Sequence, residues 1–204
     1  MPKLDAYVSR AQAKSWLWRW LVNPDQPPLA WISDPDPEAA RKLLIEPQTP
    51  PWTSIWRGGS GGGRLDFSCS PGLVLGGLTG QVKNTAATPL LKCLRPSCAS
   101  PQAKHALESM QGPWLGRLLP GPLVHATCTK DEQPVGIFGS SAALLDQVGL
   151  LCQTKDKKPR RTQAIGGAGG KDFELTCPKG QVLTGLQTRT AHYFRAIGIQ
   201  CRAQ

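Results

Sequence analysis

Six of the seven cysteines form three equally spaced pairs, and thiols at fixed spacing can make disulfides or hold a metal. The members of each pair lie 24 positions apart: Cys69 and Cys93, Cys128 and Cys152, Cys177 and Cys201. This phase predicts one bridge per window, although six cysteines allow fifteen connectivities and buried free thiols are the alternative. Cys98 either replaces Cys93 as the partner of Cys69 or stays free. Zinc is not expected, because no Cys-x-x-Cys pair occurs.

No other residues form a recognisable catalytic set. His105, His125 and His192 have no Cys, Asp or Glu at ligand spacing, and no pair of carboxylates recurs in phase with the cysteines. Asp146 lies six positions before Cys152, where we expect it to cap a turn. Because a glycosidase needs two carboxylates across a cleft, a polysaccharide hydrolase is a minor alternative, and we expect neither an enzyme nor a cofactor.

Two glycine runs, at 58–62 and 166–170, could be mistaken for phosphate-binding loops. Neither is followed by Gly-Lys-Ser/Thr or by a helical pattern, so we expect them to form bends at strand entrances instead. Both runs begin eleven positions before a cysteine, Cys69 in one case and Cys177 in the other. The glycine runs therefore share the phase of the cysteines.

The remaining chemistry is basic. The net charge is +10, and a cluster of cations follows the second cysteine window: Lys155, Lys157, Lys158, Arg160 and Arg161. A basic surface favours acidic partners such as an anionic membrane, an acidic protein surface or a sulfated glycan. Nucleic acid is not expected, because the cluster lacks interleaved aromatic residues and no known binding motif is present.

The elements that position these residues form a three-fold internal repeat of strands. Each cysteine window has a glycine eight positions after its first cysteine, and in the second and third windows every other residue before Cys152 and Cys201 is a branched apolar one. Alternation with period two between glycines indicates half-buried strands. We place the repeats at about 58–93, 121–152 and 166–201, with an insert at about 94–120 that contains a short helix at 100–112.

The first 57 residues differ from the repeats in composition. They hold nine of the 19 prolines and six of the seven tryptophans: Trp16, Trp18, Trp20, Trp31, Trp52 and Trp56. Helical patterns at 5–22 and 36–45 are separated and followed by proline-rich segments. This segment has little core of its own, so we expect its tryptophans to dock on the repeats or on a partner.

The spacing of glycines and cysteines resembles the repeat of the vitelline-membrane outer-layer family and similar bacterial modules. The third repeat carries the resemblance best, with Gly166 to Gly170, Cys177, Gly185, Gly198 and Cys201. The resemblance covers 58–204 and implies an all-β fold, a β-prism of three Greek-key sheets about a pseudo-three-fold axis. The jacalin-type lectins share that architecture, so the resemblance also raises a glycan-binding function, although we find no clear jacalin-like sugar loop.

Two functions remain open at this stage. The first is a non-enzymatic interaction or structural module, an accessory subunit that docks to a larger protein assembly through residues 1–57 and the basic repeats. The alternative is a secreted or periplasmic lectin-like protein. Paired cysteines favour an oxidising compartment, although the chain begins with no recognisable signal peptide and contains no apolar run long enough to span a membrane.

Overall fold

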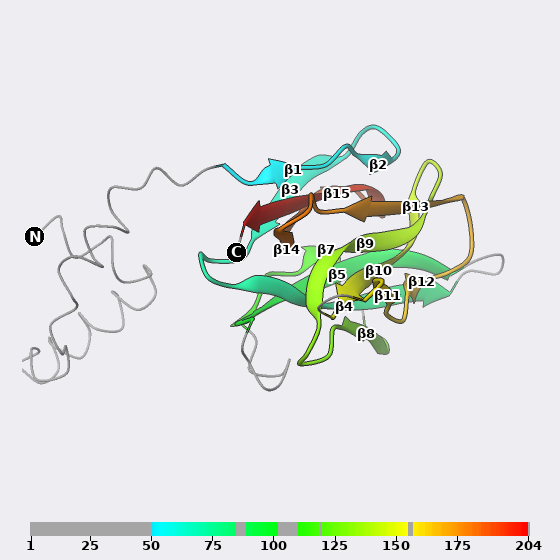
Figure 1. Cartoon of the computed structure of the whole chain (residues 1–204). Coiled ribbons are helices and arrows are strands. Elements are labelled where there is room, and N and C mark those ends of the chain that lie inside the picture. The colour runs from blue at the N-terminus through cyan, green and yellow to red at the C-terminus, as the bar shows by residue number, and fades with distance from the viewer. Residues whose placement is uncertain (1–49, 85–88, 102–109, 119, 155–156, 204) are drawn as a thin grey trace, which may run out of the picture. The chain divides into compact units, whose positions relative to one another are not determined.

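The chain from Pro50 onward forms three five-stranded antiparallel sheets in a computed structural model (Figure 1). The structure describes residues 50–84, 89–101, 110–118, 120–154 and 157–203. These residues contain strands and no helix, which confirms the all-β prism expected from the repeat. The helices expected at 5–22 and 36–45, and most of the one at 100–112, lie outside the described residues.

Each sheet has a long central hairpin flanked by shorter strands. Sheet A consists of β1 (Trp52–Thr53), β2 (Arg57–Gly58), β3 (Gly63–Ser68), β14 (Gln181–Thr190) and β15 (Phe194–Ala203). Sheet B consists of β4 (Val74–Asn84), β5 (Pro89–Ala99), β6 (Met110–Gln111), β7 (Leu115–Gly116) and β8 (Leu123–Thr127). Sheet C consists of β9 (Gln133–Ser141), β10 (Leu145–Gln153), β11 (Arg160–Arg161), β12 (Ile165–Gly166) and β13 (Lys171–Thr176).

Each sequence repeat contributes strands to two different sheets. The first repeat places β3 at the edge of sheet A and then crosses to form the β4–β5 hairpin of sheet B. The second does the same from sheet B to sheet C, and the third from sheet C to sheet A. Sheet A therefore joins the two ends of the described chain, because β1 pairs with β15 and β3 pairs with β14 (Figure 1).

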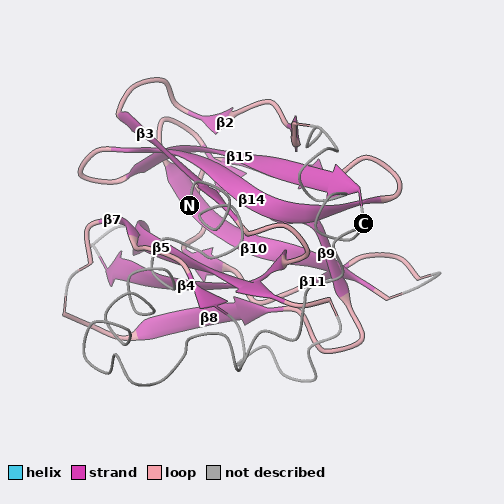
Figure 2. Cartoon of the chain, turned by 90° about the vertical axis from the view of Figure 1, so that its left-hand side faces the viewer, coloured by secondary structure: helices cyan, strands magenta, loops and turns pink. Residues whose placement is uncertain are grey.

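The core lies between the three sheets, which Figure 2 shows stacked around it. Alternate residues of the central hairpins point inward, including Leu78, Ile137 and Leu186, each at most 1% exposed. The period-two pattern of the sequence thus places the inner face of every sheet in one apolar cluster. Burial of this cluster is the main stabilising contribution to the fold.

The sheets are joined at one end of the prism by three equivalent backbone hydrogen bonds. Each central hairpin has a β-bulge there, at Gly76, Val135 and Thr184. The carbonyl of each bulge residue accepts the amide of the cysteine that begins another repeat, at 3.1, 2.8 and 2.8 Å for Cys128, Cys177 and Cys69 respectively. These three hydrogen bonds are related by the pseudo-three-fold symmetry of the prism.

The disulfides lie at this same end, and one pairing differs from the prediction. Cys128–Cys152 and Cys177–Cys201 join cysteines 24 positions apart, but Cys69 bonds to Cys98, 29 positions away. The Cys69–Cys93 pairing is therefore wrong, and Cys93 is a buried free thiol. The reason is strand register. Leu75 and Leu183 each lie six positions after the first cysteine of their window, and the residues paired with them are Cys98 and Cys201 respectively. The first hairpin is simply longer.

The described body begins before Gly58, where we expected the repeats to start. The chain divides into one unit at Met1–Thr49 and another at Pro50–Gln204. Trp52 pairs in register with Cys201, so this tryptophan belongs to sheet A. Among the described residues, no helix is long and apolar enough to cross a membrane.

Candidate functional site

A second set of β-bulges marks the opposite end of the three hairpins. The bulged residues are Lys92 on β5, Asp146 on β10 and Arg195 on β15. Each lies six positions before its disulfide cysteine, so the three positions are equivalent in the repeat. A bulge bends its strand and redirects a side chain, and such bulges are common beside functional sites. The three equivalent positions thus present two cations and one carboxylate.

A glycine approaches each bulge closely. Gly116, Gly166 and Gly58 pair in register with the residue after the bulge and have φ values of 89°, 127° and 110°. A Cβ atom on any of them would overlap the carbonyl group of the bulged residue. Only glycine fits this left-handed conformation and close approach, which explains why the glycine runs share the phase of the cysteines.

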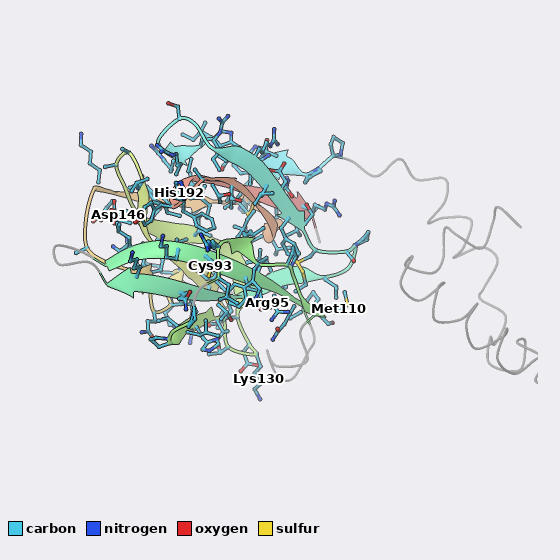
Figure 3. The ribbon with its side chains drawn as sticks, turned by 180° about the vertical axis from the view of Figure 1, so that it is seen from behind. Cys93, Arg95, Met110, Lys130, Asp146 and His192 are labelled. Carbon is cyan, nitrogen blue, oxygen red and sulfur yellow. A yellow bond between two sulfur atoms is a disulfide. The ribbon has the colours of Figure 1, made fainter. Side chains whose placement is uncertain are left out.

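We call the end of sheet C formed by residues 141–146 and 166–170 the tip of sheet C. Gly167 donates its amide to the Asp146 carbonyl at 3.1 Å, and the Ala142 amide donates to the Leu144 carbonyl at 2.9 Å. A Cβ atom on Gly170 would lie 2.6 Å from Asp146 Oδ2, so the glycine run encloses the carboxylate. Figure 3 shows Asp146 at this end of the prism, with Met110 at the other.

The carboxylate of Asp146 lacks a partner. Its Oδ2 atom is buried and accepts no hydrogen bond among the described residues, and the same holds for the hydroxyl of buried Ser140 on the neighbouring strand β9. Burial raises the pKa of the Asp146 carboxyl above its ordinary value. A buried acceptor with no donor is costly, and such atoms commonly mark a site that a ligand or water completes.

The equivalent cations behave differently from each other. Lys92 is buried, and its Nζ atom donates to the His192 carbonyl at 3.2 Å and lies 3.7 Å from the centre of the Tyr193 ring. Lys92 therefore links sheet B to the end of sheet A formed by residues 57–62 and 189–195, which we call the tip of sheet A. Arg195 is half-buried and makes no ion pair among the described residues. Asp146 is thus the one carboxylate among the three bulged positions.

Two of the five cations of the predicted basic cluster are neutralised by carboxylates. Arg160 pairs with Glu132 at 2.6 Å, and Arg161 pairs with Glu174 at 2.7 Å while its guanidinium lies 5.0 Å from the Phe138 ring centre. Lys157 and Lys158 are exposed, and Lys155 lies outside the described residues. The two arginines therefore connect β11 to Glu132, just before β9, and to β13 within sheet C, which gives them a structural role in the described chain.

The Arg160–Glu132 pair leads to a stability prediction. The hydrogen bonds from Arg160 lower the pKa of Glu132 to about 2, so the ionised form stabilises the fold above the ordinary carboxyl pKa and loses this effect as pH falls through about 2. Because Arg160 is about half exposed, solvent screening limits the effect, and we expect Glu132→Gln to cost about 1 kcal/mol at pH 7. Urea denaturation at pH 7 and pH 2 measures it. An equal loss at both pH values would contradict the assignment.

The other predicted site residues divide between the sheets and the undescribed segment. Trp56 lies on sheet A, where its ring centre is 5.0 Å from the Arg189 guanidinium, and Trp52 is exposed on β1. The other four tryptophans lie outside the described residues. Their role as a docking surface therefore stays a prediction. No group of three or more potential metal ligands occurs among the described residues.

Sequence reasoning assigned Asp146 only to a turn and missed its relation to the glycine run. The equivalence of these positions was visible in the sequence. Asp146 and Arg195 lie equally far before Cys152 and Cys201, and Gly166 and Gly58 lie equally far before Cys177 and Cys69. In the structure each glycine pairs with the residue after the corresponding bulge. What the sequence did not show was that the glycines of one repeat enclose the bulge of another. That contact depends on the exchange of strands between sheets.

These features define a β-prism, and solved structures share it. No protein-family model and no curated protein matches the chain. Calystegia sepium agglutinin covers 76% of this chain and 97% of its own at 18% identity, with a TM-score of 0.55. A mannose-binding lectin from Champedak covers 76% and 99% at 19% identity (TM-score 0.56), and a prostate-specific WGA16 glycoprotein lectin covers 74% and 99% at 18% identity (TM-score 0.54).

The likeness establishes the architecture of the prism. The structural neighbours are jacalin-related lectins, so the prediction of a jacalin-like prism is confirmed. At such low identity the comparison concerns fold alone, because one fold hosts many functions. Resemblance to the vitelline-membrane outer-layer repeat has no support from a family model and remains a prediction. A function must therefore come from the site itself.

Proposed function

We propose that this protein is a non-enzymatic glycan-binding protein whose sugar site is the tip of sheet C. The observation that carries the proposal is the buried, unpartnered Oδ2 atom of Asp146 inside the glycine run 166–170. Sugar hydroxyl groups are donors that suit a carboxylate acceptor, and hydrogen bonds to a charged group are the stronger kind. Lectins are among the structural neighbours, and one of them, Calsepa lectin, was solved in complex with a biantennary N-glycan, which supports this proposal.

The arrangement fits binding better than catalysis. A glycosidase of the usual kind needs a second carboxylate across the sugar, whereas the equivalent bulged positions hold Lys92 and Arg195. A single carboxylate with glycine backbone around it can orient a sugar through its hydroxyl groups without reacting. The close packing of Gly166 and Gly170 also fixes the carboxylate before a ligand arrives, which lowers the entropic cost of binding.

The raised pKa of Asp146 makes the proposal testable by substitution. A native-state pKa above the unfolded value means that ionisation costs stability, and that stability declines as pH rises through the native pKa. We expect Asp146→Asn to have a Tm at pH 7 equal to or above that of the wild type. We also expect the variant to bind glycan at least about tenfold more weakly, because a charged acceptor is lost.

The experiment is a glycan array followed by calorimetric titration with the best-bound neutral glycan. The matched control is Asp172→Asn, which removes an exposed carboxylate from β13 and should leave binding unchanged. Wild-type affinity should weaken as pH falls below the native pKa of Asp146. An array with no glycan above background, or equal affinity in the Asp146→Asn variant, would refute the proposed function.

The compartment, the docking of residues 1–57 and the family of the protein, all raised by the sequence, remain proposals. Three disulfides are typical of an oxidising compartment, which suits a secreted or periplasmic lectin-like protein. Docking of residues 1–57 on another protein, and kinship with the vitelline-membrane outer-layer family, are compatible with glycan binding. Neither is needed for it.

A further inference from the structure

Two arginines at the tip of sheet A lack a carboxylate partner. Arg189 and Arg195 form no ion pair among the described residues, unlike Arg64, Arg160 and Arg161. We call them the arginine patch. They are neighbours in the β14–β15 hairpin, because Arg195 is the bulged residue beside Ala196, and Ala196 pairs with Arg189.

One member of the arginine patch, Arg189, lies beside a further arginine that has the same charge. Arg189 lies directly opposite Arg64 in the β14–β3 register, and like charges in that arrangement destabilise a sheet. Asp66 neutralises Arg64 through contacts of 2.7 to 3.0 Å, but in the described part of the chain Arg189 contacts only the Trp56 ring, 5.0 Å from its guanidinium. A ring on one face of a guanidinium leaves its N–H edge available for an anion.

The arginine patch adjoins the proposed sugar site. Gly59 donates its amide to the Arg195 carbonyl at 2.9 Å, and a Cβ atom on Gly59 would overlap the carbonyl group of Ala143 in the tip of sheet C. The two tips are therefore in contact through their backbones. Figure 3 shows the labelled Asp146 and His192, which belong to these two tips, at the same end of the prism.

We propose that the arginine patch binds an acidic group, a sulfate or a carboxylate, on the glycan whose neutral sugar is held at Asp146. The inference rests on the proposed function and names its ligand class as acidic glycans. Planar guanidinium groups that have no carboxylate partner among the described residues match the paired oxygens of sulfate and carboxylate. The adjacent carboxylate of Asp146 disfavours a uniformly anionic ligand, which is why a glycan with mixed neutral and acidic sugars fits better than nucleic acid or an anionic bilayer.

The test uses the full chain and the variant Arg189→Gln/Arg195→Gln. The control variant Lys130→Gln/Lys179→Gln removes two exposed cations from turns at the other end of the prism. The probes are a heparin oligosaccharide, its desulfated form, and its desulfated and carboxyl-reduced form. A neutral biantennary N-glycan probes the Asp146 site separately. Because Arg189 packs on Trp56, the single variant Arg195→Gln guards against misfolding, since Arg195 makes no ion pair or ring contact among the described residues.

We expect wild type and control to bind a charged heparin form more tightly than the neutral form, with the preference reduced by salt. The arginine variants should lose at least about tenfold in affinity for the charged form and keep neutral N-glycan affinity. The desulfated form tells sulfate from carboxylate. Equal losses in the lysine control, or tighter binding of duplex DNA or anionic vesicles through the same arginines, would overturn the inference. Loss of neutral binding by Asp146→Asn would still support the proposed function.

Discussion

Replacing Cys98 with serine should lower the free energy of unfolding by about 3 to 4 kcal/mol, the largest effect expected for any single cysteine. The Cys69–Cys98 bridge closes a loop with a sequence separation of 29, and loop closure of that length restricts the unfolded chain by roughly this amount. The bridge also holds Cys69, whose amide donates to the Thr184 carbonyl of the third repeat at 2.8 Å. Denaturant unfolding under non-reducing conditions measures the loss.

Cys93→Ala is the matched comparison for this prediction. Cys93 is buried and forms no disulfide, so its replacement removes only one packed sulfur and should cost about 1 kcal/mol. Alkylation of the unfolded, unreduced wild type should label one thiol among the described cysteines, and burial, which raises the pKa of Cys93, should protect it in the native protein. A larger loss from Cys93→Ala than from Cys98→Ser would restore the pairing of Cys69 with Cys93.

Gly170→Ala should remove glycan binding and destabilise the prism together. Gly170 has φ of 62°, and an added Cβ would lie 2.6 Å from Asp146 Oδ2 and would also overlap the Ser141 carbonyl group. The methyl group must displace either the carboxylate or the β9 backbone. We expect a stability loss of about 2 to 3 kcal/mol and affinity at least about a hundredfold lower.

The control for this substitution is Gly72→Ala. Gly72 also has a left-handed backbone, with φ of 82°, but an added Cβ would meet nothing within 4 Å. Its substitution carries only the conformational cost, about 1 kcal/mol, and it lies in the turn at the other end of the prism. Thermal unfolding and glycan titration of both variants separate the two effects. Glycan affinity that survives Gly170→Ala would show that the carboxylate is not held by the glycine run.

The course of the strands was predictable because the repeat signals are local. Alternating residues before Cys152 and Cys201, and glycines at fixed distances, required strands and bends whatever the tertiary structure. The cysteine that bonds to Cys69 was not predictable from spacing. The spacing of two cysteines includes the length of the hairpin between them, whereas a disulfide depends on which residues face each other across the strands. Five additional residues between Leu75 and Cys98, relative to Leu183 and Cys201, moved the partner of Cys69 without changing the sheet.

The two candidate sites were hidden for a different reason. Asp146 is enclosed by Gly170, and Gly59 joins the Arg195 backbone to the tip of sheet C only when the N-terminal strands close sheet A. These contacts join segments that are distant in sequence, and no local pattern records them. Once Cys98 replaces Cys93 as the reference, however, Lys92, Asp146 and Arg195 fall at one position of the repeat. The corrected disulfide therefore supplies the alignment that exposes the site.

The most direct test of the account is to locate the bound sugar by amide chemical shifts. A ¹H–¹⁵N spectrum of the full chain is recorded while the neutral biantennary N-glycan is added, for wild type and for Asp146→Asn. Sugar binding at the tip of sheet C predicts shifts concentrated at residues 141–146 and 166–170 in the wild type and absent in the variant. Shifts concentrated at the disulfide end, for example at Ser70 to Leu73, or shifts unchanged by the substitution, would contradict it.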